Sequence, residues 1–84
     1  MTVNATLQTY TQEIYFIDKD GNNFTETKIS NEAYTVTTPS GYTNFLGWQE
    51  FYNNAPTGRV LEVGKSYYDV GSNKSIHYEP VFST

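Results

Sequence analysis

The 84-residue chain contains no cysteine. No disulfide, thiolate nucleophile or thiolate metal ligand can therefore form. This excludes the class of small secreted domains that are held together by disulfides, although it does not fix the cellular compartment. A single domain of this length buries only about 60 per cent or slightly more of the surface of the unfolded chain, so a few large side chains must stabilise it.

Basic residues are also scarce. The chain has 5 Lys and Arg against 9 Asp and Glu, a net charge of -4, and no basic cluster. Nucleic acids and acidic membrane surfaces require a basic footprint, so we expect neither as a partner. No apolar run approaches the length of a membrane span, and the N-terminus lacks a signal-peptide pattern, so we expect no membrane insertion. The sequence is compatible with a segment cut from a longer protein.

Leu and Ala are few, and aromatic residues take their place. Eight Tyr, five Phe and one Trp make up 17% of the chain, and each ring can bury roughly 150 to 250 Å². Together with abundant Thr and Val, they favour strands, because branched and aromatic side chains fit a pleated surface. We therefore predict a mostly β or α+β domain of short antiparallel and mixed strands.

Turn residues divide the chain at short intervals, as in a small β-rich domain. The clearest prediction is a hairpin over residues 13–29, in which "KDGNN" separates "EIYFID" from "FTETKI", because Asp-Gly tolerates positive φ. Further turns are predicted at Ser40-Gly41, Gly64-Lys65 and "GSNKS". Pro80 in the closing strand indicates an edge position or a bulge. Residues 1–12, with Val3, Ala5 and Leu7 on one parity, are a lead-in or a first edge strand.

The central stretch "GYTNFLGWQE", residues 41–50, has two interpretations. Phe45, Trp48, Gln49 and Tyr52 follow the i, i+3, i+4, i+7 spacing of an amphipathic helix over residues 43–56. Gly47 inside that helix would cost about 1 kcal/mol relative to Ala, and no second helix is predicted for it to pack on. We favour a strand, and the helix remains the alternative.

The order of these segments resembles the Listeria-Bacteroides repeat, also called the internalin B-type B repeat. The resemblance covers residues 13–82, and its most specific element is "GYTNFLGW". Three departures indicate a divergent member: Asn44 is an extra residue within the Tyr-Thr-Phe segment, "GWQE" replaces the more usual Gly-Trp-Tyr, and Phe82 stands where Trp is common.

The resemblance implies a β-grasp-like domain, similar in shape to ubiquitin-like modifiers. It also implies one repeat of a tandem array in a bacterial cell-surface or secreted protein, acting as an extracellular spacer and adhesion module without catalysis. The expected partners are neighbouring repeats of the same chain and a host-surface protein or glycan. The residues expected to form the core are Ile14, Phe16, Tyr34, Val36, Tyr42, Phe45, Trp48, Ile76 and Phe82.

No residue set predicts a catalytic, metal or cofactor site. The stretch from Asp18 to Glu26 has some oxygen ligands of a calcium loop, but its spacing does not match an EF-hand, and a hairpin turn explains the same residues. His77, the one histidine, is expected on the solvent face of the last strand, opposite Ile76 and Tyr78. The glutamates are scattered along the chain, so they form no carboxylate pair by sequence proximity.

Three tyrosines, Tyr52, Tyr67 and Tyr68, are the candidate ligand surface. Tyr67 and Tyr68 are adjacent, so on one strand they must point to opposite faces, which leaves one of them exposed. An exposed Tyr suits a carbohydrate or protein surface, because the ring offers apolar area and the hydroxyl a hydrogen bond. The alternative function is therefore a carbohydrate-binding module that uses these tyrosines and Trp48. A third interpretation is self-association through an edge-like last strand.

Overall fold

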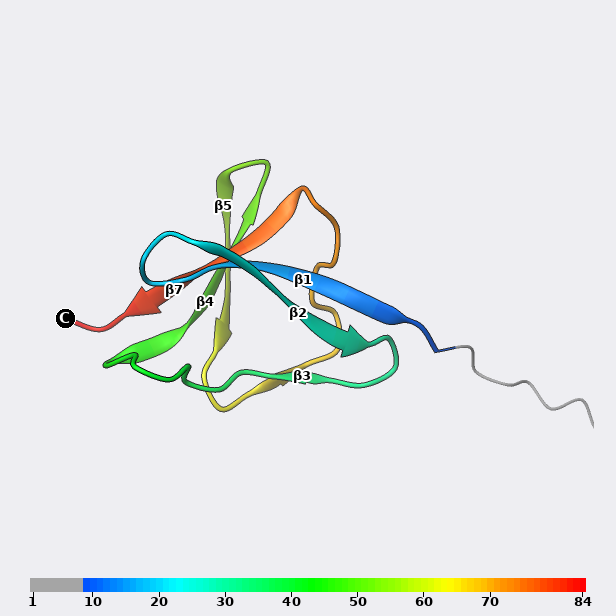
Figure 1. Cartoon of the computed structure of the whole chain (residues 1–84), viewed down its shortest axis with the longest axis horizontal. Helices are drawn as coiled ribbons and strands as arrows, with labels where there is room; N and C mark the ends of the chain where they lie inside the picture. The colour runs from blue at the N-terminus through cyan, green and yellow to red at the C-terminus, as the bar shows by residue number, and fades with distance from the viewer. Residues whose placement is uncertain (1–8) are drawn as a thin grey trace, which may run out of the picture.

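The computed structural model describes residues 9–84, which form strands joined by turns and loops and contain no helix (Figure 1). The prediction of a mostly β domain is confirmed, and the helical alternative for residues 43–56 is wrong, because this segment forms a strand and the start of the next. The strands are β1 (Thr11–Ile17), β2 (Asn23–Ile29), β3 (Tyr34–Thr35), β4 (Phe45–Tyr52), β5 (Ala55–Glu62), β6 (Ser66–Tyr67) and β7 (Ile76–Phe82).

The strands form a five-stranded sheet in the order β2-β1-β7-β4-β5 and a two-stranded sheet of β3 and β6. The first and last strands run parallel, with Phe16 opposite Tyr78, and every other pairing is antiparallel. The predicted edge position of the last strand is wrong, because β7 lies between β1 and β4. Pro80 has no backbone N–H to donate to a neighbouring strand. It is tolerated in β7 because β1 pairs with this strand at Tyr78, two residues before Pro80.

The predicted N-terminal hairpin is confirmed. Strands β1 and β2 pair in continuous register from Thr11 opposite Ile29 to Ile17 opposite Asn23. In the turn, Asp18 Oδ1 accepts hydrogen bonds from the backbone N–H groups of Asn22 (2.8 Å) and Asp20 (2.9 Å). The hydrogen bond from Asn22 is the main influence that lowers the pKa of the Asp18 carboxyl below its ordinary value.

The strand at the start of the domain is longer than predicted. Thr11 and Gln12 belong to β1 and pair with Ile29 and Lys28 of β2, so the first strand begins two residues before the predicted boundary at residue 13. The alternation of Val3, Ala5 and Leu7 lies outside the described residues. Among residues 9–84, no helix is long and apolar enough to cross a membrane.

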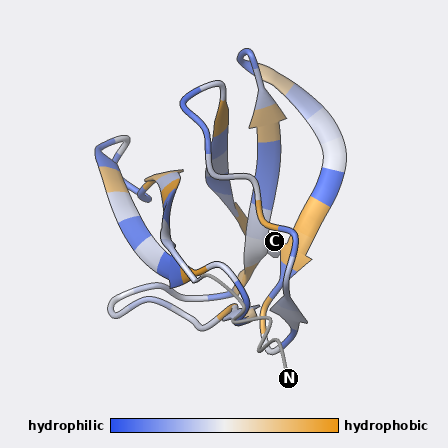
Figure 2. Cartoon of the chain, turned by 90° about the vertical axis from the view of Figure 1, so that its right-hand side faces the viewer, coloured by the Kyte–Doolittle hydropathy of each residue, from blue (hydrophilic) through white to orange (hydrophobic). Residues whose placement is uncertain are grey.

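The hydrophobic core lies between the five-stranded sheet and the segments that carry β3 and β6. Hydrophobic and hydrophilic residues alternate along the strands (Figure 2), as expected where one face of a sheet is covered and the other is not. The buried hydrophobic residues are Ile14, Phe16, Val36, Phe45, Trp48, Leu61, Val70 and Tyr78.

Five of the nine predicted core residues are buried, and Tyr34, Tyr42 and Ile76 are half-buried against them. The assignment of Phe82 to the core is wrong, because 40% of this residue is exposed. Phe82 stands at the end of β7, where its ring contacts those of Tyr42 and Phe45 and its other side faces solvent. Leu61, Val70 and Tyr78 are core residues that the sequence analysis did not identify.

A β-bulge in β4 places Phe45 and Trp48 on the same face of the sheet. Phe45 lies opposite Phe82 and Gly47 opposite Val81, so β4 has one extra residue at this point. Gly47 has a φ of 151°, and a Cβ atom at this position would overlap the carbonyl oxygen of Leu61. Only glycine allows the two backbones to approach this closely.

The edge strand β2 carries a buried lysine. Lys28 is 5% exposed, and its ammonium group donates hydrogen bonds to Gln12 Oε1 (3.1 Å) and to the carbonyl oxygens of Ile29 (3.1 Å) and Ser30 (3.3 Å). Three acceptors satisfy the three donors of the ammonium group. The charge is therefore held at the point where the hairpin leads into the connection to β3.

Candidate functional site

The three candidate tyrosines differ in their surroundings. Tyr52, at the end of β4, is 51% exposed, and Tyr68 is 70% exposed. Tyr67 is half-buried against the core, and its hydroxyl accepts a hydrogen bond from the backbone N–H of Glu62 at 2.9 Å. The adjacent pair thus presents one ring to solvent and one to the core.

These tyrosines do not form one surface. The Tyr67 hydroxyl contacts Glu62, which lies opposite Gly47 in the sheet. Gly47 is five residues from Tyr52 along β4, a separation of about 17 Å. The structure therefore does not bring Tyr52 together with Tyr67. Trp48 is 1% exposed, so its ring is packed in the core and is not a solvent-facing platform.

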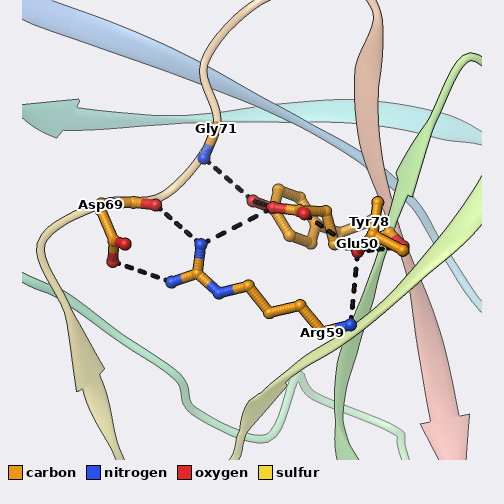
Figure 3. Close-up of polar contacts among 6 residues, drawn as sticks. Glu50, Arg59, Asp69, Gly71 and Tyr78 are labelled. Carbon is orange, nitrogen blue, oxygen red and sulfur yellow. Dashed lines mark hydrogen bonds and ion pairs between the residues drawn. The ribbon is translucent and has the colours of Figure 1, made fainter.

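A polar network around Tyr78 lies at the border of the core (Figure 3). The Tyr78 hydroxyl donates to Glu50 Oε2 (2.9 Å) and accepts from the backbone N–H of Gly71 (2.9 Å). Burial raises the pKa of the Tyr78 hydroxyl well above its ordinary value, and the bond to Glu50 adds to the rise. The hydroxyl stays protonated and joins β4 and β7 to the loop that contains Gly71.

Arg59 on β5 extends this network to the same loop (Figure 3). Its guanidinium donates to Asp69 Oδ1 (2.8 Å) and to the Asp69 carbonyl oxygen (2.9 Å), and lies 3.7 Å from Glu50 Oε2. The hydrogen bond from Arg59 lowers the pKa of the Asp69 carboxyl. Thr57 donates to Glu50 Oε1 (3.0 Å). Both Glu50 oxygens thus have protein partners, so we interpret the network as structural.

No local sequence pattern could have identified this network. Glu50 and Tyr78 are 28 residues apart in the chain, and Arg59 and Asp69 are 10 residues apart. They meet because β4 lies between β5 and β7. The scattered glutamates of the sequence therefore include one, Glu50, that the sheet places among an arginine, a tyrosine and a threonine.

The face of the sheet opposite the core carries a shallow depression of about 650 Å³. It is lined by residues of β1, β2 and β7 and of two turns: Tyr15, Phe16, Ile17, Asn23, Phe24, Thr25, Asn54, Lys74, His77 and Glu79. Aromatic, amide, hydroxyl and charged groups therefore converge on one surface. We call this surface the outer-face depression.

His77 contributes to the outer-face depression. It lies on the face opposite the buried Tyr78, as predicted, but it is half-buried and not freely exposed. Its ring stacks on Phe51 with centroids 4.9 Å apart and an interplanar angle of 10°, and Nε2 lies 2.9 Å from Glu79 Oε2. The imidazole is thus fixed in position by one aromatic ring and one carboxylate.

The suggested calcium loop is a hairpin turn in the structure. Asp18 uses Oδ1 to bind backbone N–H groups within the turn, and Asp20 lies beside Lys19, whose ammonium group is 3.4 Å from Asp20 Oδ2. Among residues 9–84, no three His, Cys, Asp or Glu side chains are grouped as metal ligands. The acidic residues of this turn are therefore explained by backbone hydrogen bonding and a surface ion pair.

Comparisons with protein-family models, with curated proteins and with solved structures found no match to this chain. The resemblance to the Listeria-Bacteroides repeat stays a prediction from the sequence. The functional proposals below therefore depend on the geometry of the domain itself.

Proposed function

We propose that the domain is a non-catalytic, extracellular spacer module of a bacterial cell-surface or secreted protein. The observation that supports this proposal is the parallel, adjacent arrangement of the first and last strands. Thr11 lies five residues before Phe16 on β1, and Phe82 lies four residues after its partner Tyr78 on β7. The two strand ends are therefore nine residues apart along a common direction, or about 30 Å.

This separation suits a unit that adds length to a chain. Figure 1 shows β1 starting at one side of the domain and β7 ending at the other. An antiparallel first and last strand would instead bring both ends to one side, and successive copies would fold back on each other. Parallel terminal strands allow each copy to continue in the direction of the last, as the proposed partnership with neighbouring repeats requires.

The strand order also supports a β-grasp-like fold as part of the proposal. The first strand, β1, and the last strand, β7, form a parallel pair inside the sheet. The hairpin partner β2 lies on the outer side of β1, and β4 lies on the other side of β7. The segment between β2 and β4 contains β3 and no helix. The proposed relationship is therefore to a variant of that fold in which an extended segment covers the sheet.

We assign the adhesion role of the module to the outer-face depression and not to the three tyrosines first considered. The depression brings Tyr15, His77 and Glu79 to one surface. Tyr52 stands at the end of β4, whereas Tyr67, on β6, contacts Glu62 near the other end of that strand. A Tyr15→Ser variant should lose adhesion to host cells or to immobilised host glycans, and Tyr68→Ser should retain it. Equal adhesion of both variants would contradict this assignment.

The spacer role is tested with two copies of the chain joined head to tail. Small-angle X-ray scattering should show a maximum dimension that exceeds that of one copy by about 30 Å or more, because each copy contributes the length between its strand ends. A second tandem protein with a long Gly/Ser linker between the copies serves as the control for flexible joining. Two copies that lie side by side, with little gain in length, would overturn the spacer proposal.

A further inference from the structure

The five-stranded sheet has two outer strands, β2 and β5, and they differ. β5 contains Pro56 and the positive-φ residue Gly58, and its pairing with β4 shifts register between Gln49 and Phe51. Proline and bulges keep an edge strand from pairing with another chain. β2 has neither, since it contains no proline and pairs with β1 in continuous register over all of its 7 residues. β2 is therefore the edge that is open to a further strand.

The hydrogen bonds at the two ends of the hairpin identify which backbone groups of β2 are free. At the turn, the Asp18 N–H donates to the Asn22 carbonyl oxygen (2.8 Å). At the other end, the Ser30 N–H donates to the Tyr10 carbonyl oxygen (2.9 Å). Hydrogen-bonded and non-hydrogen-bonded pairs alternate along an antiparallel ladder, so the even-numbered residues of β2 bond to β1. Within residues 23–27, the N–H and C=O groups that point away from β1 are those of Asn23, Thr25 and Thr27.

These free groups are accessible. Asn23, Thr25 and Thr27 are exposed, and no turn or loop among residues 9–84 forms a backbone hydrogen bond with them. The free stretch ends there, because the carbonyl oxygen of Ile29 already accepts from a backbone N–H. An inward-pointing charge protects an edge when a partner strand would have to bury it. The ammonium group of Lys28 is already buried with three acceptors, so it does not oppose pairing.

We propose that β2 pairs with β2 of a second copy of the domain, antiparallel and related by a two-fold axis at Thr25. Thr25 of one copy then lies opposite Thr25 of the other, and Asn23 lies opposite Thr27. Each residue with free backbone groups thus exchanges hydrogen bonds with a residue of the second copy, and the two five-stranded sheets join into one. We name this contact the β2–β2 pairing.

The neighbouring registers are less favourable. A shift of one copy by two residues in one direction places Glu26 opposite Glu26, and like charges directly opposite each other are destabilising. The same shift in the other direction places Thr27 opposite Gly21 in the turn and leaves its backbone groups unpaired. In the proposed register Glu26 lies opposite Phe24, and the two Thr25 hydroxyls can hydrogen-bond across the junction. The free groups of β2 therefore match a second copy of themselves in one register.

The β2–β2 pairing would also enlarge the outer-face depression. Asn23 and Thr25 line this depression, and both lie at the junction. A two-fold axis perpendicular to the sheet keeps the outer faces of both copies on the same side, so the two depressions meet. Three residue pairs form a small contact, and we expect a dimer Kd of about 0.1 to 1 mM. Repeats on one surface reach such local concentrations, and this last step alone rests on the proposed function.

The register is tested by cross-linking of the full chain. The chain contains no cysteine, so Thr25→Cys introduces a single thiol. Opposite residues of a hydrogen-bonded pair have Cα atoms about 5.5 Å apart, within the span of a disulfide. Oxidised glutathione should therefore link Thr25→Cys into dimers at least about tenfold faster than Thr27→Cys, whose thiols would lie about 13 Å apart along the strand. Tyr68→Cys, at a ring that is 70% exposed, measures random collision and should match Thr27→Cys.

A charge exchange tests the two-fold axis without a cross-link. Thr25→Lys and Thr25→Glu each place like charges opposite each other, so each variant alone should dimerise at least about tenfold more weakly than the unchanged chain. An equal mixture of the two variants should recover dimerisation, because Lys then lies opposite Glu. Sedimentation equilibrium up to about 1 mM measures the three Kd values. Circular dichroism shows whether each variant keeps the fold.

Three outcomes would overturn the proposal. The first is an unchanged chain that stays monomeric up to about 1 mM while Thr25→Cys links no faster than Tyr68→Cys. The second is faster linking of Thr27→Cys than of Thr25→Cys, which would place the axis elsewhere. The third is a mixture of the charge variants that associates no better than either alone. All of these experiments use separate single copies, so they leave the spacer role to the tandem experiment.

Discussion

Phe16 on β1 and Tyr78 on β7 face each other across the one parallel pairing of the five-stranded sheet, with ring centroids 5.7 Å apart. Phe16 also stacks on Phe24 at 5.0 Å and lies 4.8 Å from the ring of Trp48. These aromatic contacts join four strands, β1, β2, β4 and β7, around one residue. The centre of this small core is therefore aromatic, and the ring of Phe16 contacts a ring from each of the other three strands.

Replacing Tyr78 by Phe should destabilise the domain without changing the shape of its core. The variant leaves the Gly71 N–H without an acceptor and removes one donor from Glu50, so we expect a loss of about 1 to 3 kcal/mol in the free energy of unfolding. Urea denaturation measures the loss. Tyr68→Phe, at a ring that is 70% exposed, should change stability by less than about 0.5 kcal/mol. Equal effects of the two changes would contradict the role given to the Tyr78 hydroxyl.

Gly47→Ala should cost more stability than Gly64→Ala. Both glycines have positive φ, 151° and 87°, so alanine is strained at either position and should cost roughly 1 to 3 kcal/mol. At Gly47 the added Cβ also meets the backbone of Leu61, whereas at Gly64 no atom lies within 4 Å of it. Thermal unfolding measures the loss of stability in each variant. Gly64→Ala shows the cost of backbone strain alone, and Gly47→Ala shows that cost together with the overlap with Leu61. A smaller loss at Gly47 would mean that β4 and β5 can move apart at the bulge.

The emission of Trp48 should report a buried indole. The ring is 1% exposed and lies within 6.3 Å, centroid to centroid, of the rings of Phe16, Phe24, Phe45 and Tyr42. We expect blue-shifted fluorescence that acrylamide and iodide quench poorly in the native protein, and a red shift with efficient quenching in denaturant. Quenching of native Trp48 as efficient as in the unfolded chain would contradict its place in the core.

Stability should decrease as the pH falls below about 4, the ordinary range of an Asp side chain. Asp18 and Asp69 both have pKa values below their ordinary value, through hydrogen bonds from Asn22 and Arg59 respectively. A lowered native pKa means that the unfolded chain takes up protons first, so this stability is complete above the unfolded pKa and is lost as pH falls through the native pKa. In an Asp18→Asn variant, urea midpoints measured between about pH 5 and 2 should fall less steeply. An unchanged slope would contradict the contribution of Asp18.

Features with local causes could be predicted from the sequence. The hairpin at residues 13–29 follows from Asp-Gly turn chemistry between two strand-like runs, and the structure adds the hydrogen bonds that Asp18 Oδ1 accepts from backbone N–H groups in the turn. The burial of Trp48 follows from the scarcity of other large apolar side chains. These predictions required no knowledge of which segments meet in space.

The central stretch was ambiguous because of the bulge at Gly47. An extra residue places Phe45 and Trp48 on the same face although they are three residues apart, which imitates the i, i+3 spacing of a helix. A regular strand would have put them on opposite faces. The helical alternative therefore arose from a local irregularity that only the pairing of β4 with β7 and β5 reveals.

The position of β7 and the polar sites depended on long-range pairing. Pro80 favoured an edge strand, but the sheet accommodates it because β1 pairs at Tyr78, two residues earlier. Glu50 and Arg59 acquire their surroundings from strands and loops that are distant in the sequence. Alternation along a strand identifies which side chains share a face, but it does not identify the neighbouring strand.

The parallel pairing of β1 and β7 also determines how the domain responds to tension. A force that pulls Thr11 and Phe82 apart acts along the two strands in opposite directions, so contacts between the strands are loaded in shear and must fail together. Strands joined in an antiparallel hairpin would be pulled open one pair at a time. Resistance to stretching is governed by the rate of forced unfolding and not by equilibrium stability. The contact between Phe16 and Tyr78 therefore lies where mechanical load on the chain would be concentrated.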